Sequence, residues 1–379
     1  MEDKHMLMIP GPTPVPEKVL ISLGKHPIGH RSGDFSKVIA EINENLKWLH
    51  QTKNEVLSLN VSGTGAMEAG MINFLSPGDR VLVGVNGKFG DRWAQICEAF
   101  GIATERITAD WGTPLDTEEI RTKLEADSNK EIKAVVITHS ETSAGVLNDL
   151  ETINKHVKAH GEALIIVDAV TSLGAYNLPI DDWELDVVAS GSQKGYMIPP
   201  GMGFISVSDK AWKAYETSKF PRFYMDLGKY KKANAKNSTP FTPPINLMFG
   251  LQTALQMMQR EGLENIFARH ARLTQATRAA ARAIGLDLLA PDDAASTAVT
   301  AIKSDDAEAI RSTMRQKYDI ALAGGQDHLK GKIFRVGHLG FISDRDVLMT
   351  ISCLEATLIE LGHDIEPKSG VKAAAAALV

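Results

Sequence analysis

Residues 163–168, Ala-Leu-Ile-Ile-Val-Asp, decide the fold, because five apolar residues in succession predict a strand that is covered on both faces. Similar short apolar runs lie on both sides of this stretch and alternate with amphipathic ones. The predicted strands are residues 55–61, 80–85, 134–138, 163–168, 187–190 and 203–207, and the predicted helices are 90–100, 117–125 and 150–160. Such alternation is typical of βαβ units, so we expect an α/β fold around a mostly parallel sheet.

The chain changes character after residue 207. Residues 208–245 are rich in Lys, Tyr and Pro, and we expect a long excursion over a surface or a partner. A long helix is predicted from about 247 to 284, with an interruption at residues 260–262. The remaining pattern predicts a smaller α+β unit, with strands at 298–303 and 333–336 and helices at 307–317 and 344–361.

These patterns divide the chain into four segments. Residues 1–20 contain prolines at positions 10, 12, 14 and 16, which predict an extended arm rather than a helix. A large domain is expected over residues 21–262 and a small C-terminal domain over residues 263–366. The Ala-rich tail, residues 367–379, is expected at the periphery.

The composition is that of a soluble globular protein, with 44% hydrophobic and 23% charged residues in a chain of 379. The net charge of −6 is mild and the basic residues are scattered, so neither nucleic acid nor a membrane is an expected partner. No apolar run approaches the ~20 residues of a membrane span, and the N-terminus lacks a signal-peptide core. Cys97 and Cys353 are too few for a disulfide framework, an iron–sulfur cluster or a thiolate metal site. We therefore expect a cytoplasmic protein that holds no metal.

Lys194 is the first candidate for chemistry. It lies in Ser-Gly-Ser-Gln-Lys-Gly, residues 190–195, directly after a predicted strand, where open α/β sheets bind ligands. The small residues around it let a planar cofactor approach the backbone, and a confined lysine loses its proton easily enough to attack an aldehyde. By position alone, a solvated loop lysine explains the pattern more simply.

Asp168 changes that balance. It ends the apolar strand 26 residues before Lys194, a separation of about one βαβ repeat. A carboxylate at the end of a buried strand is costly unless a cation meets it. A protonated pyridine nitrogen is such a cation, and its charge makes the ring an electron sink. A helix N-cap or a metal ligand is the alternative for Asp168 alone, whereas the pair favours bound pyridoxal phosphate.

A glycine-rich turn follows the strand predicted at 55–61. The residues Ser62, Gly63, Thr64 and Gly65 lead into a helix pattern, and such a turn exposes backbone N–H groups to an anion. The turn matches neither a Walker motif nor a dinucleotide fingerprint, and an ordinary tight turn is the alternative. Phe89 begins a second helix pattern between small residues, where its ring could stack on a pyridine face or belong to the core.

With these residues collected, the chain resembles the class V aminotransferases of fold type I, specifically the alanine–glyoxylate and serine–glyoxylate group. The resemblance runs from Ile9 to about Leu361. Its motifs are Ile-Pro-Gly-Pro-Thr at 9–13, Leu-Ser-Pro-Gly-Asp at 75–79, Val-Asp-Ala-Val-Thr-Ser at 167–172, Gly-Ser-Gln-Lys at 191–194 and Arg-Val-Gly-His-Leu-Gly at 335–340. It implies a large domain with a mostly parallel sheet, a smaller α+β domain, and pyridoxal 5′-phosphate as cofactor.

The resemblance also implies roles for single residues. Lys194 would form the Schiff base with the cofactor and then shuttle the proton, while Asp168 would pair with the pyridine nitrogen. The other cofactor contacts would come from Ser62, Gly63, Thr64, Gly65, Phe89, Thr142, Gln193 and Thr242. Among these, Thr64, Gly65 and Gln193 would contact the phosphate, and Thr142 would lie near the phenolic oxygen.

Substrate contacts and a partner subunit are implied as well. Arg335 would grip the substrate α-carboxylate, a task suited to its planar fork, although a surface ion pair is the simpler alternative by position. Thr242 would reach the phosphate of a neighbouring subunit, which implies a homodimer with shared sites. Some relatives have Tyr at the position of Thr239, in the same cross-subunit loop. His30 falls in a segment that lines the substrate channel in the family, with a structural histidine as the alternative.

The implied reaction transfers an amino group from L-serine or L-alanine to glyoxylate, giving glycine and hydroxypyruvate or pyruvate. Residues 263–273 and 335–340 are most similar to the serine–glyoxylate type, in a photorespiratory or glycine-forming route. A cysteine desulfurase, the alternative within the fold, needs a cysteine on a mobile loop, and both cysteines lie in helix-like patterns. A non-catalytic subunit of a redox complex, a metal protein and a silent cofactor-binding scaffold are the alternatives from other classes.

Overall fold

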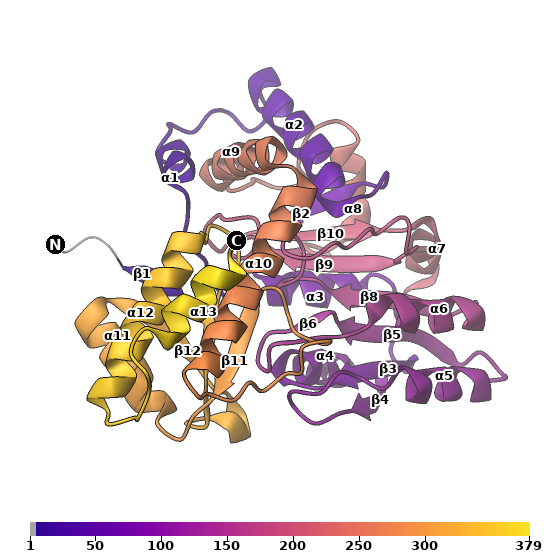
Figure 1. The fold of residues 1–379 in the computed structure, drawn as a ribbon. Helices are drawn as coiled ribbons and strands as arrows, with labels where there is room; N and C mark the ends of the chain where they lie inside the picture. The colour runs from indigo at the N-terminus through magenta and orange to yellow at the C-terminus, as the bar shows by residue number, and fades with distance from the viewer. Residues whose placement is uncertain (1–4) are drawn as a thin grey trace.

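The computed structural model describes residues 5–379, so the first four residues of the predicted arm lie outside the described residues. Two large sheets organise these residues, one of seven strands and one of four, and a further pair of short strands, β6 and β7, forms a sheet of its own (Figure 1). The strands are β1 (Met6–Met8), β2 (Val56–Leu59), β3 (Arg80–Val85), β4 (Ala103–Thr108), β5 (Ile132–Thr138), β6 (Ser140–Glu141), β7 (Val146–Leu147), β8 (Leu164–Asp168), β9 (Val187–Gly191), β10 (Gly203–Val207), β11 (Val299–Lys303), β12 (Ile320–Gly324) and β13 (Ile333–Gly337).

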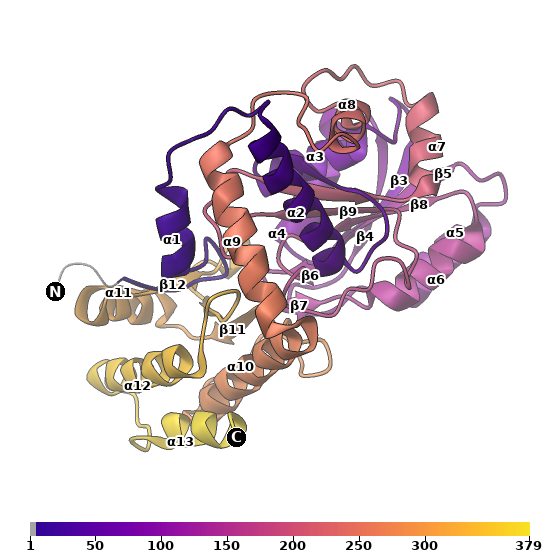
Figure 2. The same ribbon diagram turned by 90° about the horizontal axis from the view of Figure 1, so that it is seen from above.

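Helices surround both sheets. They are α1 (Glu17–Leu23), α2 (Gly33–His50), α3 (Gly63–Ile72), α4 (Lys88–Ala99), α5 (Thr117–Ala126), α6 (Leu150–His160), α7 (Asp209–Thr217), α8 (Leu227–Asn234), α9 (Ile245–Glu261), α10 (Leu263–Ala283), α11 (Ala307–Tyr318), α12 (Asp344–Glu360) and α13 (Ser369–Ala377), with a short 3-10 turn, η1 (Asp327–Leu329). Figure 2 shows α1, α2 and α9 lying together, and α9 packs against both of the others.

The large sheet confirms the predicted α/β fold. Its strand order is β2-β10-β9-β8-β5-β3-β4. β10 runs antiparallel to both of its neighbours, and the other pairs are parallel. Each of the six strands predicted before residue 208 is present, with β2 shorter than expected. β8 and β9 are neighbours, so their carboxyl ends lie at the same edge of the sheet.

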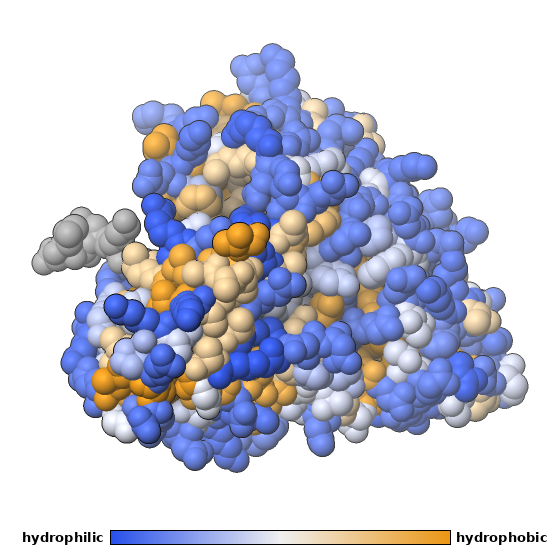
Figure 3. Space-filling view, viewed as in Figure 1, coloured by the Kyte–Doolittle hydropathy of each residue, from blue (hydrophilic) through white to orange (hydrophobic). Residues whose placement is uncertain are grey.

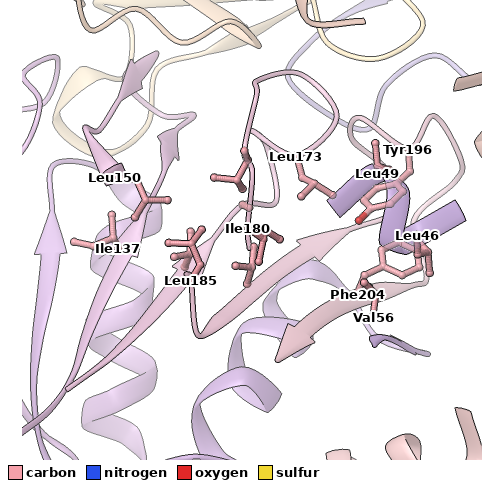
Figure 4. Packing of buried hydrophobic residues seen from close by; sticks show 14 of the residues in the cluster. Leu46, Leu49, Val56, Ile137, Leu150, Leu173, Ile180, Leu185, Tyr196 and Phe204 are labelled. Carbon is pink, nitrogen blue, oxygen red and sulfur yellow. The ribbon is translucent and has the colours of Figure 1, made fainter. Parts of the chain in front are cut away.

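Apolar residues cover both faces of this sheet, as the run at 163–168 predicts. In β5, Val135 and Ile137 belong to one buried cluster, while Ala134 and Val136 belong to the other. Figure 4 shows the first cluster, in which Leu46 and Leu49 of α2 lie near Tyr196 and Phe204. The rigid centre of the sheet therefore fixes the directions in which the residues at its carboxyl edge point.

The smaller sheet has the order β1-β12-β13-β11. β1 comes from the N-terminal segment and pairs with β12 in parallel, so this segment crosses from the small sheet to the large one. The predicted interruption of the long helix is confirmed at Gly262, which separates α9 from α10 and has a φ of +83°. The proposed domain boundaries remain a prediction.

Three details differ from the sequence expectations. The arm is not extended to residue 20, because α1 begins at Glu17, directly after Pro16. A proline is tolerated at the start of a helix, where no intrahelical bond needs its missing N–H. Residues 208–245 are not a bare excursion, since they include α7 and α8. The expected peripheral tail forms α13, which packs against α10 and α12 and buries Ala374 completely, because alanine side chains allow a close approach between helices.

Within residues 5–379, no helix is long and apolar enough to cross a membrane. Figure 3 shows a face that is largely hydrophilic, with hydrophobic residues gathered around the C-terminal helices.

Candidate active site

A cavity of about 340 Å³ lies at the carboxyl edge of the large sheet, where β8 and β9 end. This is the place at which open α/β sheets bind ligands. Its lining comprises Gly11, Pro12, Ser62, Gly63, Thr64, Met67, Phe89, Arg92, Ser140, Thr142, Asp168, Val170, Thr171, Gln193, Lys194 and Pro200. The structure therefore brings together eight of the residues named from the sequence: Ser62, Gly63, Thr64, Phe89, Thr142, Asp168, Gln193 and Lys194.

Lys194 is buried, and its amine donates a hydrogen bond to the carbonyl oxygen of Pro10. Burial lowers the pKa of Lys194 to about 8, with Asp168 opposing the change and Arg335 and Arg92 adding to it. A lysine with such a pKa is partly neutral near physiological pH, and the neutral amine is the form that attacks an aldehyde.

The N-terminal segment holds the backbone around this lysine, a feature that the sequence patterns did not indicate. The Thr13 hydroxyl donates to the Lys194 carbonyl oxygen at 3.1 Å, and the Thr13 N–H donates to the Gln193 carbonyl oxygen at 3.1 Å. Gly11 has a φ of +135°, and a Cβ there would lie 2.6 Å from the Lys194 Nζ. Only glycine fits at this position, because any side chain would displace the amine.

Asp168 is buried at the end of β8, where its Oδ1 accepts the Val170 N–H at 2.8 Å. Burial raises the pKa of Asp168 to about 6, and the charge of Lys194 only partly offsets this. A carboxylate in this position gains most from a cationic partner that enters the cavity.

The start of α3 forms an anion cradle. The Ser62 hydroxyl accepts the Gly65 N–H at 3.3 Å, and the Ser62 carbonyl oxygen accepts the Ala66 N–H at 3.0 Å. The N–H groups of Gly63 and Thr64 precede the first intrahelical bonds and lie at the positive end of the helix. Gly65 is not among the residues that line the cavity, and a Cβ there would lie 2.7 Å from the Val61 Cβ, so a side chain would be too close. Its predicted contact with the phosphate stays a prediction.

Gln193 supplies an independent sign of a bound group. Its side-chain Oε1 is buried without a hydrogen-bond partner, and Gln193 lines the cavity beside Lys194. An amide can present either its oxygen or its nitrogen, so it can satisfy a ligand group of either kind. A lysine of lowered pKa, a buried carboxylate, an anion cradle and an orphan amide together fit pyridoxal 5′-phosphate.

Glu141 is a site residue that the sequence reasoning missed. It is completely buried, and its Oε2 accepts the N–H groups of Phe89 and Gly90 at 3.0 Å each, while the Ser143 N–H and hydroxyl donate to Oε1. Burial raises the pKa of Glu141, and these hydrogen bonds oppose the rise. The carboxylate thereby holds the backbone at the start of α4, where Phe89 lies. Its position soon after β5, beside β8 and Asp168, was the available signal.

Arg335 is buried and is not among the residues that line the cavity, but it bonds to one of them. Its Nε and Nη2 donate to the Gly324 carbonyl oxygen at 3.0 and 2.8 Å, and its Nη1 donates to the Thr142 carbonyl oxygen at 2.9 Å. Burial lowers the pKa of Arg335 to about 10, with Glu141 opposing. These contacts leave one free N–H on each of the two terminal nitrogens. A carboxylate that binds to both nitrogens at once needs these two N–H groups. Thr142 itself lines the cavity and donates to the Thr171 hydroxyl at 2.8 Å.

The remaining predicted residues lie outside the cavity of this chain. His30 is half-buried in the loop between α1 and α2, and its neighbour Arg31 donates to the Ser238 hydroxyl and the Thr239 carbonyl oxygen. Thr242 is exposed, and its carbonyl oxygen accepts a hydrogen bond from Asn60 Nδ2 at 3.0 Å. Their predicted roles in substrate and cross-subunit contacts stay predictions.

The cysteines lie in helices, as predicted. Cys97 is buried in α4, where burial raises the pKa of its thiol to about 12. Cys353 is partly buried in α12, and burial raises its pKa as well. Neither lines the cavity, so neither is placed to accept sulfur from a substrate.

Comparison with known families and relatives agrees with this geometry. The family described as "Aminotransferase class-V" matches residues 10–337. A protein of Anabaena cylindrica named "Soluble hydrogenase 42 kDa subunit" is 66% identical over 100% of this chain and 99% of its own length. An L-aspartate–glyoxylate aminotransferase of Paracoccus denitrificans is 37% identical and a serine–glyoxylate aminotransferase of Methylorubrum extorquens 36%, each over 99% of this chain and 96% of the relative.

The fold agrees with solved structures. The crystal structure of an alanine–glyoxylate aminotransferase from Nostoc sp. superposes with a TM-score of 0.89 at 31% identity, over 94% of this chain and 96% of the other. The predicted fold type I architecture is thereby confirmed. The chain therefore belongs to the class V aminotransferase family, and its cofactor is pyridoxal 5′-phosphate.

Proposed function

We propose that this aminotransferase moves the amino group of L-serine or L-alanine to glyoxylate, giving glycine and hydroxypyruvate or pyruvate. The observation that carries the proposal is that one cavity holds Lys194, Asp168 and the anion cradle, and that Arg335 is bonded to the backbone of Thr142 in the cavity lining. The glyoxylate specificity in the names of the Paracoccus and Methylorubrum relatives supports the acceptor. The preferred donor depends on the residues that contact the substrate side chain, because serine differs from alanine by only one hydroxyl.

The residues divide the work by position. When bound, pyridoxal phosphate supplies an electron sink that stabilises the carbanion at the substrate Cα. Asp168 would hold the positive charge on the pyridine nitrogen, and the N–H groups of Gly63 and Thr64 would bind the phosphate. Lys194 would bind the cofactor aldehyde, and its amine, once displaced by the substrate amine, would carry the proton from the substrate Cα to the C4′ carbon of the cofactor. Phe89 would cover one face of the ring.

The proposal extends to assembly and cellular role. The exposed Thr242, on the loop between α8 and α9, would complete the phosphate site of a second copy in a homodimer with shared sites. Such an enzyme would serve a photorespiratory or glycine-forming route in the cytoplasm.

The absorbance spectrum of the purified protein tests the reaction. We expect a yellow band from the lysine-linked cofactor that bleaches on addition of the amino donor and returns on addition of glyoxylate, because each half-reaction changes the cofactor. L-serine, L-alanine and L-aspartate are compared as donors, and the fastest bleaching identifies the substrate. A band that none of these amino acids bleaches would contradict the proposal.

The name of the Anabaena relative raises the alternative of a subunit in a redox enzyme. Such a subunit with its own metal centre needs clustered ligands. Cys97 and Cys353 lie in different helices, and residues 5–379 contain no group of three or more His, Cys, Asp or Glu side chains suited to a metal ion. The assembled cavity favours catalysis by the chain itself.

Arg335 gives a separate prediction. We expect Arg335→Lys to raise the KM for the amino donor by about 10- to 100-fold, because lysine is a point charge that cannot bind a carboxylate with two nitrogens. The affinity for pyridoxal phosphate should change little, since Arg335 does not line the cofactor cavity. Steady-state kinetics and cofactor titration check both statements. A lower cofactor affinity with an unchanged KM would contradict the assignment.

A further inference from the structure

Arg92 lies in the cavity lining, but the sequence patterns gave it no role. It is one helical turn after Phe89 in α4, and its guanidinium lies over the Phe89 ring at 4.9 Å from the ring centre. Its Nη1 donates a hydrogen bond to the Thr64 hydroxyl at 3.2 Å. A contact within α4 and a hydrogen bond to α3 therefore hold the guanidinium beside the start of α3.

This guanidinium has no carboxylate partner among residues 5–379. The contrast is with Arg106 on the neighbouring strand β4, which pairs with Asp91 at 2.6 Å and Glu98 at 2.9 Å. The charge of Arg92 instead acts on the cavity, where it lowers the pKa of both Lys194 and Asp168. An arginine without a partner beside an anion cradle is suited to bind an anion that enters the cavity.

We propose that Arg92 binds the phosphate of the cofactor and makes the site selective for the phosphorylated form over pyridoxal. Thr64, the hydrogen-bond partner of Arg92, lies in the first turn of α3, and its N–H is one of the two proposed to bind the phosphate. Most of the N–H groups of the guanidinium remain available after its bond to Thr64. Arg92 and the helix start would then approach the phosphate dianion from two sides.

The substrate carboxylate is the competing anion, and the geometry favours the phosphate. Arg335 contacts Thr142, whereas Arg92 contacts Thr64 at the start of α3. The cavity therefore has two arginines attached to different parts of its wall. This role of Arg92 concerns the binding of the cofactor, so it does not depend on which amino acid is the donor.

Cofactor binding to the apoprotein tests the inference without any turnover. We would titrate wild type, Arg92→Gln and Arg92→Lys with pyridoxal phosphate and with pyridoxal, following absorbance and the quenching of intrinsic fluorescence. For Arg92→Gln we expect a roughly 10- to 100-fold weaker affinity for pyridoxal phosphate and a change within about twofold for pyridoxal. Arg92→Lys should fall between, because a lysine keeps the charge but loses the fork. Inorganic phosphate should compete with the cofactor less well in Arg92→Gln than in wild type.

Arg106→Gln is the matched control, because it removes a neighbouring guanidinium that already has carboxylate partners. It should leave both affinities within about twofold of wild type. An equal loss of affinity for pyridoxal phosphate and pyridoxal in Arg92→Gln would overturn the inference and assign Arg92 a structural role. Unchanged cofactor binding with a raised KM for the amino acid would overturn it in favour of the substrate carboxylate. An inactive wild-type enzyme would refute the proposed reaction and leave this binding test intact.

Discussion

Replacement of Lys194 by alanine is expected to lower kcat by at least about a thousandfold and to remove the lysine-linked absorbance band. The amine is the nucleophile of the cavity and the group proposed to move the substrate proton, and among residues 5–379 no other lysine lines the cavity. Lys210 offers a control, since it is partly buried, donates to the Ala163 carbonyl oxygen and does not line the cavity. We expect Lys210→Ala to keep the band and most of the activity, as measured by kinetics and spectra.

The lowered pKa of Lys194 adds a pH dependence to this prediction. Because the neutral amine attacks the aldehyde, cofactor uptake by the apoprotein should accelerate with pH and level off above the pKa of about 8. The charge of Arg335 lowers that pKa, so Arg335→Gln should move the rise to higher pH. Stopped-flow absorbance across the neutral and alkaline range measures both curves. A rate of uptake that does not vary with pH would show that the amine is not the titrating nucleophile.

The pair Lys194 and Asp168 could be predicted from the sequence for a physical reason. Strands covered on both faces read as continuous apolar runs, and parallel strands end at one edge of a sheet. A carboxylate at the end of β8 and a lysine just beyond β9 must therefore lie near each other. The edge strand β4 was missed because it is mostly polar, with Glu105 and Arg106 at its centre and only Ile107 buried.

The supporting residues could not be predicted in the same way. Pro10 contacts Lys194 through a backbone carbonyl, so its side chain carries no signal of that role. Glu141 acts by accepting the N–H groups of Phe89 and Gly90, which are about 50 residues earlier in the chain. Arg92 depends on the rotation of α4, which packing against the sheet decides. Each role arises from a meeting of distant segments that no local pattern records.

Replacement of Asp168 by asparagine is expected to lower kcat by roughly a hundredfold or more, because the neutral amide cannot hold the pyridine nitrogen protonated. The affinity for pyridoxal phosphate should also fall. Asp186→Asn is the matched control, since Asp186 is another buried carboxylate whose pKa is raised by burial, but it bonds to Ser208 and Ile165 outside the cavity. That variant should retain its rate and its spectrum. Asp168→Asn with wild-type kcat would contradict the role.

Asp168→Asn should also stabilise the apoprotein, and the pH dependence of that gain tests its cause. The pKa of Asp168 rises from 3.8 to about 6 on folding, so the folded chain binds this proton more tightly than the unfolded chain. The contribution of Asp168 to the free energy of unfolding therefore falls by about 3 kcal/mol as pH rises between these two values, and it is constant above and below them. Asparagine does not titrate, so its advantage should be complete at neutral pH and absent below about pH 4. Urea denaturation of both apoproteins at several pH values measures the difference. If the gain disappears once cofactor is added, the charge of Asp168 is costly in the empty cavity and is stabilised by the cation on the cofactor. Equal stability of the two proteins at all pH values would instead mean that other groups of the chain already compensate the charge of Asp168.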